Sequence, residues 1–130
     1  MIIMNLNYAS FWKRLTAYNI DLTILVLVLF PLSMVIEDNS IFYGVCFTVV
    51  IGYHAGLESS RYQATLGKRY HGLLVMDQNG EPLSFIKALL RILLKFVSAA
   101  IALAGFTMIA LNKRKQGLHD YILGTVVVIK

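Results

Sequence analysis

Six polar residues in an otherwise apolar chain have the types and the spacing from which an ion or proton site could be built. Asp21 follows Arg14 by seven residues, and Glu58 follows His54 by four, so each pair lies on one face of a helix. A carboxyl group in an apolar medium has a raised pKa unless a cation offsets it, so such an acid could take up and release a proton. The full candidate set is Arg14, Asp21, His54, Glu58, Arg91 and Asp120.

Asp21 is the most demanding member of this set. It lies about 9 Å along a helix from Leu15, and an acid at that depth in a membrane costs roughly 2.5–3.5 kcal/mol. One interpretation is an ion or proton site. The other is a structural ion pair between Arg14 and Asp21, or one that holds the first helix against the C-terminal tail through Asp120. Both interpretations fit the spacing.

His54 and Glu58 allow three interpretations. They could form a proton relay, supply two metal ligands, or make an interfacial His–Glu pair that satisfies both side chains. Two ligands do not make a metal site, and the sequence places neither His71 nor His119 beside them. The His–Glu pair is the prediction, with no metal and no cofactor.

Composition indicates the environment in which these residues lie. The 130 residues suffice for a single domain, residues 1–130. Apolar residues make up 58% and charged residues 15%, against about 25% charged residues in soluble domains. Disorder is thereby excluded, and the single Cys46 excludes an internal disulfide. The net charge of +5 indicates membrane topology rather than nucleic-acid binding.

Two apolar stretches have the length of membrane spans, about residues 15–36 and about 41–58. The basic flanks Lys13, Arg14 and Arg61 predict cytoplasmic ends, whereas Glu37 and Asp38 fall in the outer turn. Residues 61–84 are predicted to form a cytoplasmic loop. Within it, residues 73–76 are a strand candidate, Asn79–Gly80 predicts a tight turn, and Ser84 predicts a helix N-cap.

Residues 85–111 form a third apolar segment, with a stripe of cations at Lys87, Arg91 and Lys95. The segment either lies on the cytoplasmic surface over residues 85–94 and then crosses once, or it returns as a hairpin. Lys87 and Lys95 are expected to be ordinary topology-setting charges. The C-terminal tail, residues 112–130, is basic and ends in a strand candidate over residues 125–129 whose available partner is residues 73–76. These features favour the hairpin and two cytoplasmic termini.

The order of short motifs along nearly the whole chain resembles the RDD family of small membrane proteins. The matching stretches are Phe11-Trp12-Lys13-Arg14-Leu15 with Asp21, Thr65-Leu66-Gly67-Lys68-Arg69, Gly72-Leu73-Leu74-Val75 with Asp77 and Gly80, Leu90-Arg91, and Gln116-Gly117-Leu118-His119-Asp120 with Thr125-Val126-Val127. The name-giving Arg and two Asp correspond to Arg14, Asp21 and Asp120. The resemblance implies a membrane location and a transport-related role, without a substrate.

The predicted fold class is therefore an all-α integral membrane protein. We expect a bundle of three to four hydrophobic helices with a small cytoplasmic β-hairpin element, in a bacterial-type cytoplasmic membrane. The predicted function is a small transport protein, with H⁺ or Na⁺ as the coupling ion. Because two or three spans do not enclose a path, transport would require a homo-oligomer or a membrane complex. The alternative is a non-transporting scaffold or assembly protein whose charged cluster is structural. We expect no enzymatic activity and no partner besides lipid, other subunits and the coupling ion.

Overall fold

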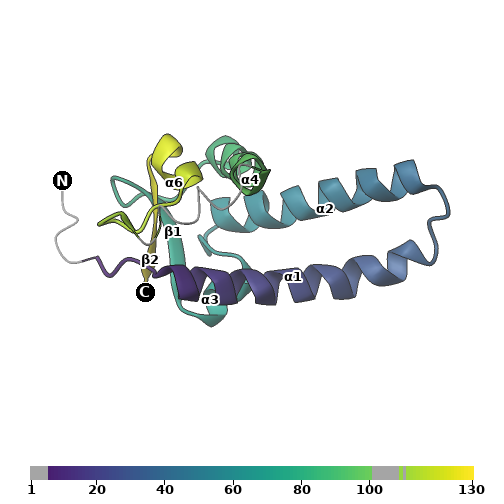
Figure 1. Cartoon of the computed structure of the whole chain (residues 1–130), viewed down its shortest axis with the longest axis horizontal. Helices are drawn as coiled ribbons and strands as arrows, with labels where there is room; N and C mark the ends of the chain where they lie inside the picture. The colour runs from purple at the N-terminus through teal and green to yellow at the C-terminus, as the bar shows by residue number, and fades with distance from the viewer. Residues whose placement is uncertain (1–5, 101–108, 110) are drawn as a thin grey trace.

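Two long helices extend side by side from a cap of shorter elements (Figure 1). The computed structural model describes residues 6–100, 109 and 111–130. In chain order its elements are α1 (Phe11–Ser33), α2 (Asn39–Ser59), α3 (Leu66–Tyr70), β1 (Leu73–Asp77), α4 (Phe85–Ala100), α6 (Leu118–Leu123) and β2 (Thr125–Ile129). The shorter elements α3, β1, α4, α6 and β2 together are called the cap. The described residues are mostly helical, as predicted, and contain one small sheet.

Side-chain caps determine where the two long helices begin. The Ser10 hydroxyl accepts a hydrogen bond from the backbone N–H of Lys13 at 3.4 Å, so α1 begins at Phe11 rather than near residue 15. The Asp38 carboxylate accepts from the N–H of Ile41 at 3.0 Å, so α2 begins at Asn39 rather than at residue 41. Hydropathy alone therefore located both helices, but it began each of them too late and extended the first one beyond its end at Ser33.

The apolar side chains of α1 and α2 are largely exposed. Both helices are long and apolar enough to cross a membrane. Leu27 and Met34 are each 70% exposed, and Phe47 on α2 is 56% exposed. The core helix of a soluble protein would bury such residues, so these two helices carry their apolar surface on the outside.

The two strand candidates pair as predicted. β1 and β2 run antiparallel, with Val75 opposite Val127, and Tyr8 bridges Val128 on the other edge of β2. The expected β-hairpin is wrong in its connection, because α4 and α6 lie between the strands along the chain. The element is a two-stranded sheet that joins the middle of the chain to its end.

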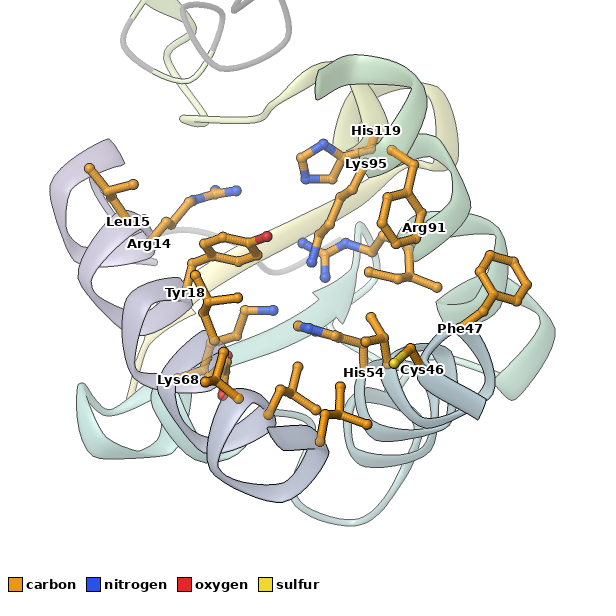
Figure 2. Close-up of a pocket in the computed structure, with 18 of the residues that line it drawn as sticks. Arg14, Leu15, Tyr18, Cys46, Phe47, His54, Lys68, Arg91, Lys95 and His119 are labelled. Atoms are coloured by element: carbon orange, nitrogen blue, oxygen red, sulfur yellow. The ribbon is translucent and has the colours of Figure 1, made fainter. Parts of the chain in front are cut away.

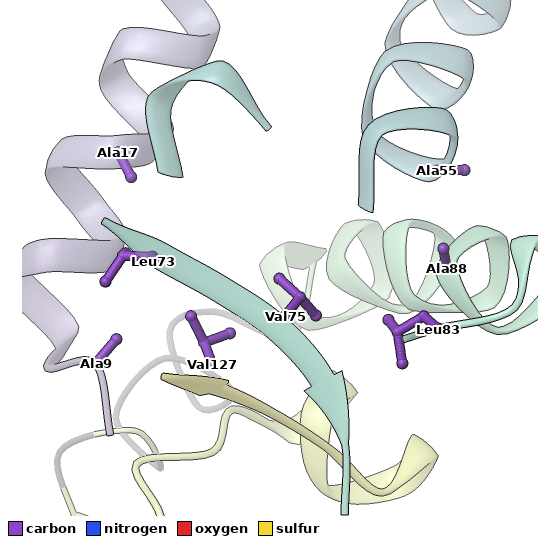
Figure 3. Packing of buried hydrophobic residues seen from close by; sticks show 8 residues of the cluster. All are labelled: Ala9, Ala17, Ala55, Leu73, Val75, Leu83, Ala88 and Val127. Atoms are coloured by element: carbon purple, nitrogen blue, oxygen red, sulfur yellow. The ribbon is translucent and has the colours of Figure 1, made fainter. Parts of the chain in front are cut away.

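The apolar core lies where this sheet meets the cap ends of the helices (Figure 3). Its members are small or β-branched: Ala9, Ala17, Ala55, Leu73, Val75, Leu83, Ala88 and Val127. The alanines allow helix and strand backbones to approach closely, so the core fixes the cap rather than the length of α1 and α2.

Helix α4 crosses the other two helices instead of running along them, since it is drawn nearly end-on in Figure 1. The Ser84 hydroxyl accepts a hydrogen bond from the backbone N–H of Lys87 at 3.3 Å, which confirms Ser84 as the predicted helix N-cap. Arg91 and Ile92 are buried, whereas Phe85 and Ile86 are exposed. Whether the segment 85–111 crosses once or returns as a hairpin depends on residues 101–108 and 110, which lie outside the described residues.

The register of the sheet predicts a specific disulfide. The Val75 N–H donates to the Gln63 carbonyl, and the Val127 carbonyl accepts from the Ala9 N–H, so the two valines are a non-hydrogen-bonded pair, whose Cα atoms lie about 4.5 Å apart. In a Cys46→Ser background, Val75→Cys with Val127→Cys should form an intramolecular disulfide on mild oxidation. Val75→Cys with Val128→Cys, on opposite faces, is the control. Equal cross-linking of both pairs on a non-reducing gel would contradict the register.

Candidate functional site: a buried charge cluster

Asp120 is the acid that joins the two ends of the chain. It lies in the first turn of α6 and is fully buried. Its carboxylate accepts hydrogen bonds from the Arg14 guanidinium on α1, from Arg91 Nε at 2.9 Å on α4, and from the Thr125 hydroxyl at 3.0 Å on β2. It also accepts from the N–H of Gly117 at 3.2 Å. Asp120 therefore connects four elements. Its ion pair with Arg14 is the predicted one between the first helix and the C-terminal tail.

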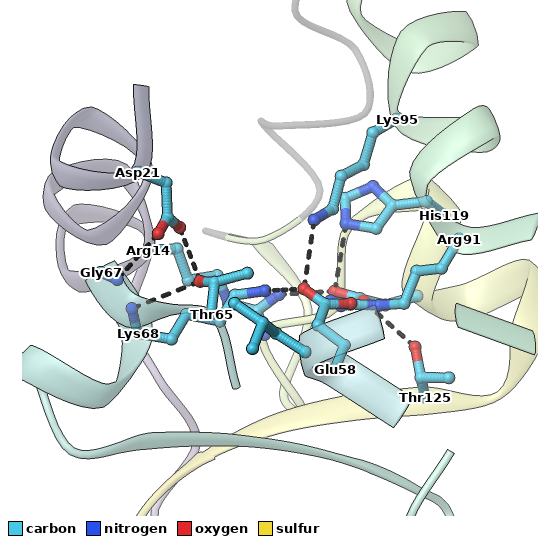
Figure 4. Close-up of polar contacts among 12 residues, drawn as sticks. Arg14, Asp21, Glu58, Thr65, Gly67, Lys68, Arg91, Lys95, His119 and Thr125 are labelled. Atoms are coloured by element: carbon cyan, nitrogen blue, oxygen red, sulfur yellow. Dashed lines mark hydrogen bonds and ion pairs between the residues drawn. The ribbon is translucent and has the colours of Figure 1, made fainter. Parts of the chain in front are cut away.

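Glu58 is the second buried acid, at the end of α2, with 1% of its surface exposed. Arg91 Nη1 donates to it at 2.6 Å, and Arg91 Nη2 donates to Asp120 at 2.6 Å, so a single guanidinium bridges both acids (Figure 4). Lys68 on α3 forms a hydrogen-bonded ion pair with Glu58, and Lys95 Nζ lies 3.6 Å from it. The expectation that Lys95 is an ordinary topology-setting charge is therefore wrong.

Asp21 is held by neutral donors. The Tyr53 and Thr65 hydroxyls donate to its carboxylate at 2.6 Å each, and the N–H of Gly67 donates at 2.7 Å. The interpretation in which Arg14 pairs with Asp21 is wrong, because Arg14 is bound by Asp120 and by the carbonyl of Lys115. The alternative that tied the first helix to the tail through Asp120 is the one that the geometry supports.

Gly67 brings α3 against α1. A Cβ atom at this position would lie 2.0 Å from the carbonyl oxygen of Ala17, which no side chain tolerates. The absence of a side chain lets the Gly67 N–H reach Asp21. In the sequence Gly67 was singled out only as part of the stretch Thr65-Leu66-Gly67-Lys68-Arg69, and this packing role was not predicted.

Two histidines are buried near the charge cluster. His54 and His119 are each 3% exposed, and the Nδ1 atom of each has no hydrogen-bond partner among the described residues. The predicted hydrogen-bonded His54–Glu58 pair is wrong for the described residues, since Glu58 is taken by Arg91 and Lys68. His119 Nε2 lies 3.6 Å from Asp120.

Burial and paired charges determine the protonation of the groups outside the two long helices. Burial by itself would raise the pKa of the Asp120 carboxyl, but Arg91 and Arg14 outweigh it and hold that pKa well below its usual range. Burial lowers the pKa of His119 to about 3, against the opposing charge of Asp120. At neutral pH Asp120 is therefore ionised and His119 is neutral.

A groove of about 1040 Å³ opens between α1, α2 and α4 (Figure 2). Most of its lining is apolar and comes from residues such as Leu25, Leu29 and Phe47. The cap end is different, because there Arg91, Lys95 and neighbouring basic groups form the lining.

The structure brings four of the six predicted residues into direct contact: Arg14, Glu58, Arg91 and Asp120. Asp21 lies in a neighbouring site of its own, and His54 lines the groove. The residues that sequence reasoning missed are Tyr53, Thr65, Gly67, Lys68, Lys95 and Thr125. The stretch Thr65-Leu66-Gly67-Lys68-Arg69 was the one signal that could have found three of them.

The described residues thus combine two long apolar helices with a cap that is linked to them by a buried charge cluster. The chain belongs to the RDD family, whose model matches residues 8–124, and this confirms the resemblance seen in the sequence.

Two relatives from Bacillus subtilis (strain 168) are similar to this chain. The uncharacterized protein YxaI is 37% identical over 86 residues, which are 66% of this chain and 56% of YxaI, so the match spans little more than half of that relative. The uncharacterized membrane protein YteJ is 28% identical over 134 residues, which cover 93% of this chain and 80% of YteJ. No solved structure matches the chain significantly.

The close approach at Gly67 predicts a large effect of one methyl group. Gly67→Ala should lower the free energy of unfolding by about 1–3 kcal/mol or more, because backbone atoms must move apart and the hydrogen bond to Asp21 is strained. Gly56→Ala on α2 is the matched control, since nothing lies within 4 Å of its added Cβ. It should be neutral or stabilising by up to about 1 kcal/mol. Thermal unfolding in detergent measures both, and equal melting temperatures for the two variants would contradict the packing.

Proposed function

We propose that this RDD-family chain is a non-enzymatic, multi-pass protein of the cytoplasmic membrane that acts as a scaffold or assembly protein. In this proposal the charged cluster fixes the fold and does not carry ions. The observation that supports it is the way the buried acids are used. Each of them accepts its hydrogen bonds from at least two elements other than its own.

The partners of the acids show this arrangement. Asp120 connects α6 to α1, α4 and β2, and Glu58 connects α2 to α3 and α4. Asp21 connects α1 to α2 and α3. A carboxylate that must exchange an ion needs an open coordination position. An acid that clamps elements together keeps its partners instead, because breaking a buried pair leaves an uncompensated charge.

The inverted amphipathicity of the helices supports a membrane location. On α4 the charged Arg91 faces inward, whereas Phe85 and Ile86 face outward. α1 and α2 likewise expose their apolar residues. This distribution suits a lipid solvent, which accepts apolar side chains and requires charges to be paired inside. Membership of the RDD family and the similarity to the membrane protein YteJ also support a membrane location.

The charges at the two ends of the molecule support an orientation. Glu37 and Asp38 lie in the α1–α2 turn, whereas Lys13, Arg61 and Arg69 lie near the cap. The positive-inside rule assigns the cap to the cytoplasm. Tyr8 pairs with Val128 beside the sheet, so the described ends of the chain lie together on that side.

A second candidate function is ion-coupled transport with Asp21 as the coupling carboxylate. Asp21 lines the groove and has only neutral hydrogen-bond donors among the described residues, which distinguishes it from Glu58 and Asp120. Because α1 and α2 by themselves do not enclose a path, this function requires a homo-oligomer or a larger membrane complex.

Ion flux separates the two candidates. The full chain is reconstituted into vesicles that carry a pH- or Na⁺-sensitive dye, beside Asp21→Asn and the control Glu81→Gln, an exposed acid after β1. We expect wild-type H⁺ and Na⁺ flux equal to that of protein-free vesicles, because every buried acid is engaged. Flux above that level would overturn the scaffold proposal, and its loss in Asp21→Asn but not in Glu81→Gln would establish the transport candidate.

A further inference from the structure

The groove between α1, α2 and α4 has two chemically different ends. Along the two long helices its walls are apolar and include Leu25, Leu29, Phe47 and Val50. Toward the cap the lining contains Arg14, Lys68, Arg91 and Lys95 (Figure 2). A volume of about 1040 Å³ lies at the upper end of the range for ligand pockets. The shape and lining suit an elongated molecule with an apolar body and a polar end.

The polar end of the groove presents positive charge. Glu58 and Asp120, which neutralise these cations from behind, do not line the groove. Asp21 does line it, but its carboxylate is already engaged by Tyr53, Thr65 and Gly67. Among the described residues, four cations line this end of the groove, Arg14, Lys68, Arg91 and Lys95, and they outnumber by two the acids that pair with them, Glu58 and Asp120. A negatively charged ligand would improve this balance, and buried charges favour such pairing.

Two buried histidines line the same end of the groove. His54 and His119 both line it, both are 3% exposed, and the Nδ1 atom of each lacks a partner among the described residues. A neutral imidazole N–H donates readily to an anionic oxygen. Lys95 is also available to an anion, because its ion pair with Glu58 is long at 3.6 Å and its side chain is 17% exposed.

We propose that the groove binds one molecule of an anionic phospholipid. The singly charged phosphodiester lies at Lys95, His54 and His119, and the acyl chains lie along the apolar walls of α1 and α2. Basic pockets at the cytoplasmic ends of membrane helices bind lipid head groups in this way. A lipid site goes beyond the scaffold role, and it requires no ion movement.

Binding by the purified full chain in detergent tests the proposal. Native mass spectrometry with phosphatidylglycerol and with phosphatidylcholine of the same acyl chains gives the stoichiometry and the dissociation constants. We expect one bound phosphatidylglycerol and clearly weaker phosphatidylcholine binding. Inorganic phosphate at the same concentration should not displace the lipid, because it lacks the acyl chains.

Two variants with matched controls examine the two ends of the groove. Lys95→Gln should weaken phosphatidylglycerol binding by about fivefold, the effect of one cation at an anionic head group. Lys87→Gln, on the same helix but outside the groove, should not. Leu29→Trp should weaken binding of both lipids by filling the apolar part. Leu27→Trp on the outer face of α1 should not.

Each contrary result overturns the proposal in a distinct way. Equal affinity for the two lipids, or equal effects of Lys95→Gln and Lys87→Gln, would mean nonspecific attraction. Displacement by inorganic phosphate would mean a free-anion site. If Lys95→Gln fails to fold, the choice between the two lipids by the wild type and the Leu29→Trp comparison decide. Failure of lipid binding leaves the flux result, and hence the scaffold proposal, unaffected.

Discussion

The guanidinium of Arg91 is the group on which the arrangement of the cap depends. It donates to Asp120 with two of its nitrogens and to Glu58 with the third, and it is 1% exposed. Through these two acids it fixes the relative positions of α2, α4 and α6. Asp120 then extends the connection to Arg14 near the start of α1. Arginine suits this position because its planar fork serves two carboxylates at once, which a lysine does not.

A buried charge cluster has a large desolvation cost, and what it contributes to the fold is specificity for one arrangement. Removing two charges from water costs several kcal/mol per ion, so a well-packed apolar replacement is often equally stable. In a membrane, however, apolar contacts between helices bring little advantage over contacts with lipid. Charge pairs distinguish one arrangement from others where apolar packing does not. We infer that the cluster selects the position of the cap on α1 and α2, while the small alanine-rich core beneath the sheet stabilises the cap itself.

Sequence reasoning found the candidates and misassigned several of their partners. Arg14, Glu58, Arg91 and Asp120 were recognisable because charged residues in apolar segments are rare and must be compensated. The β1–β2 pairing followed from two short apolar stretches that each needed a partner. The pairing of Arg14 with Asp21 failed because a shared helix face is only one of the ways to satisfy an acid. The beginning of α3 supplied Thr65, its N-cap, and the Gly67 N–H instead, and the spacing of charges along α1 does not indicate which segment will fold back onto it.

Asp120 and Arg14, separated by 106 positions along the chain, must be energetically coupled if the charge cluster holds the cap in place. A double-mutant cycle in detergent with Arg14→Gln and Asp120→Asn measures this coupling through the free energy of unfolding. We predict a coupling energy in the range of about 0.5–3 kcal/mol. Arg14→Gln combined with Glu37→Gln should be additive within about 0.5 kcal/mol, because Glu37 lies in the turn beyond the far end of α1, whose residues 14–33 alone span about 28 Å. Additivity of Arg14→Gln and Asp120→Asn to the same degree would show that this ion pair does not hold the cap on α1.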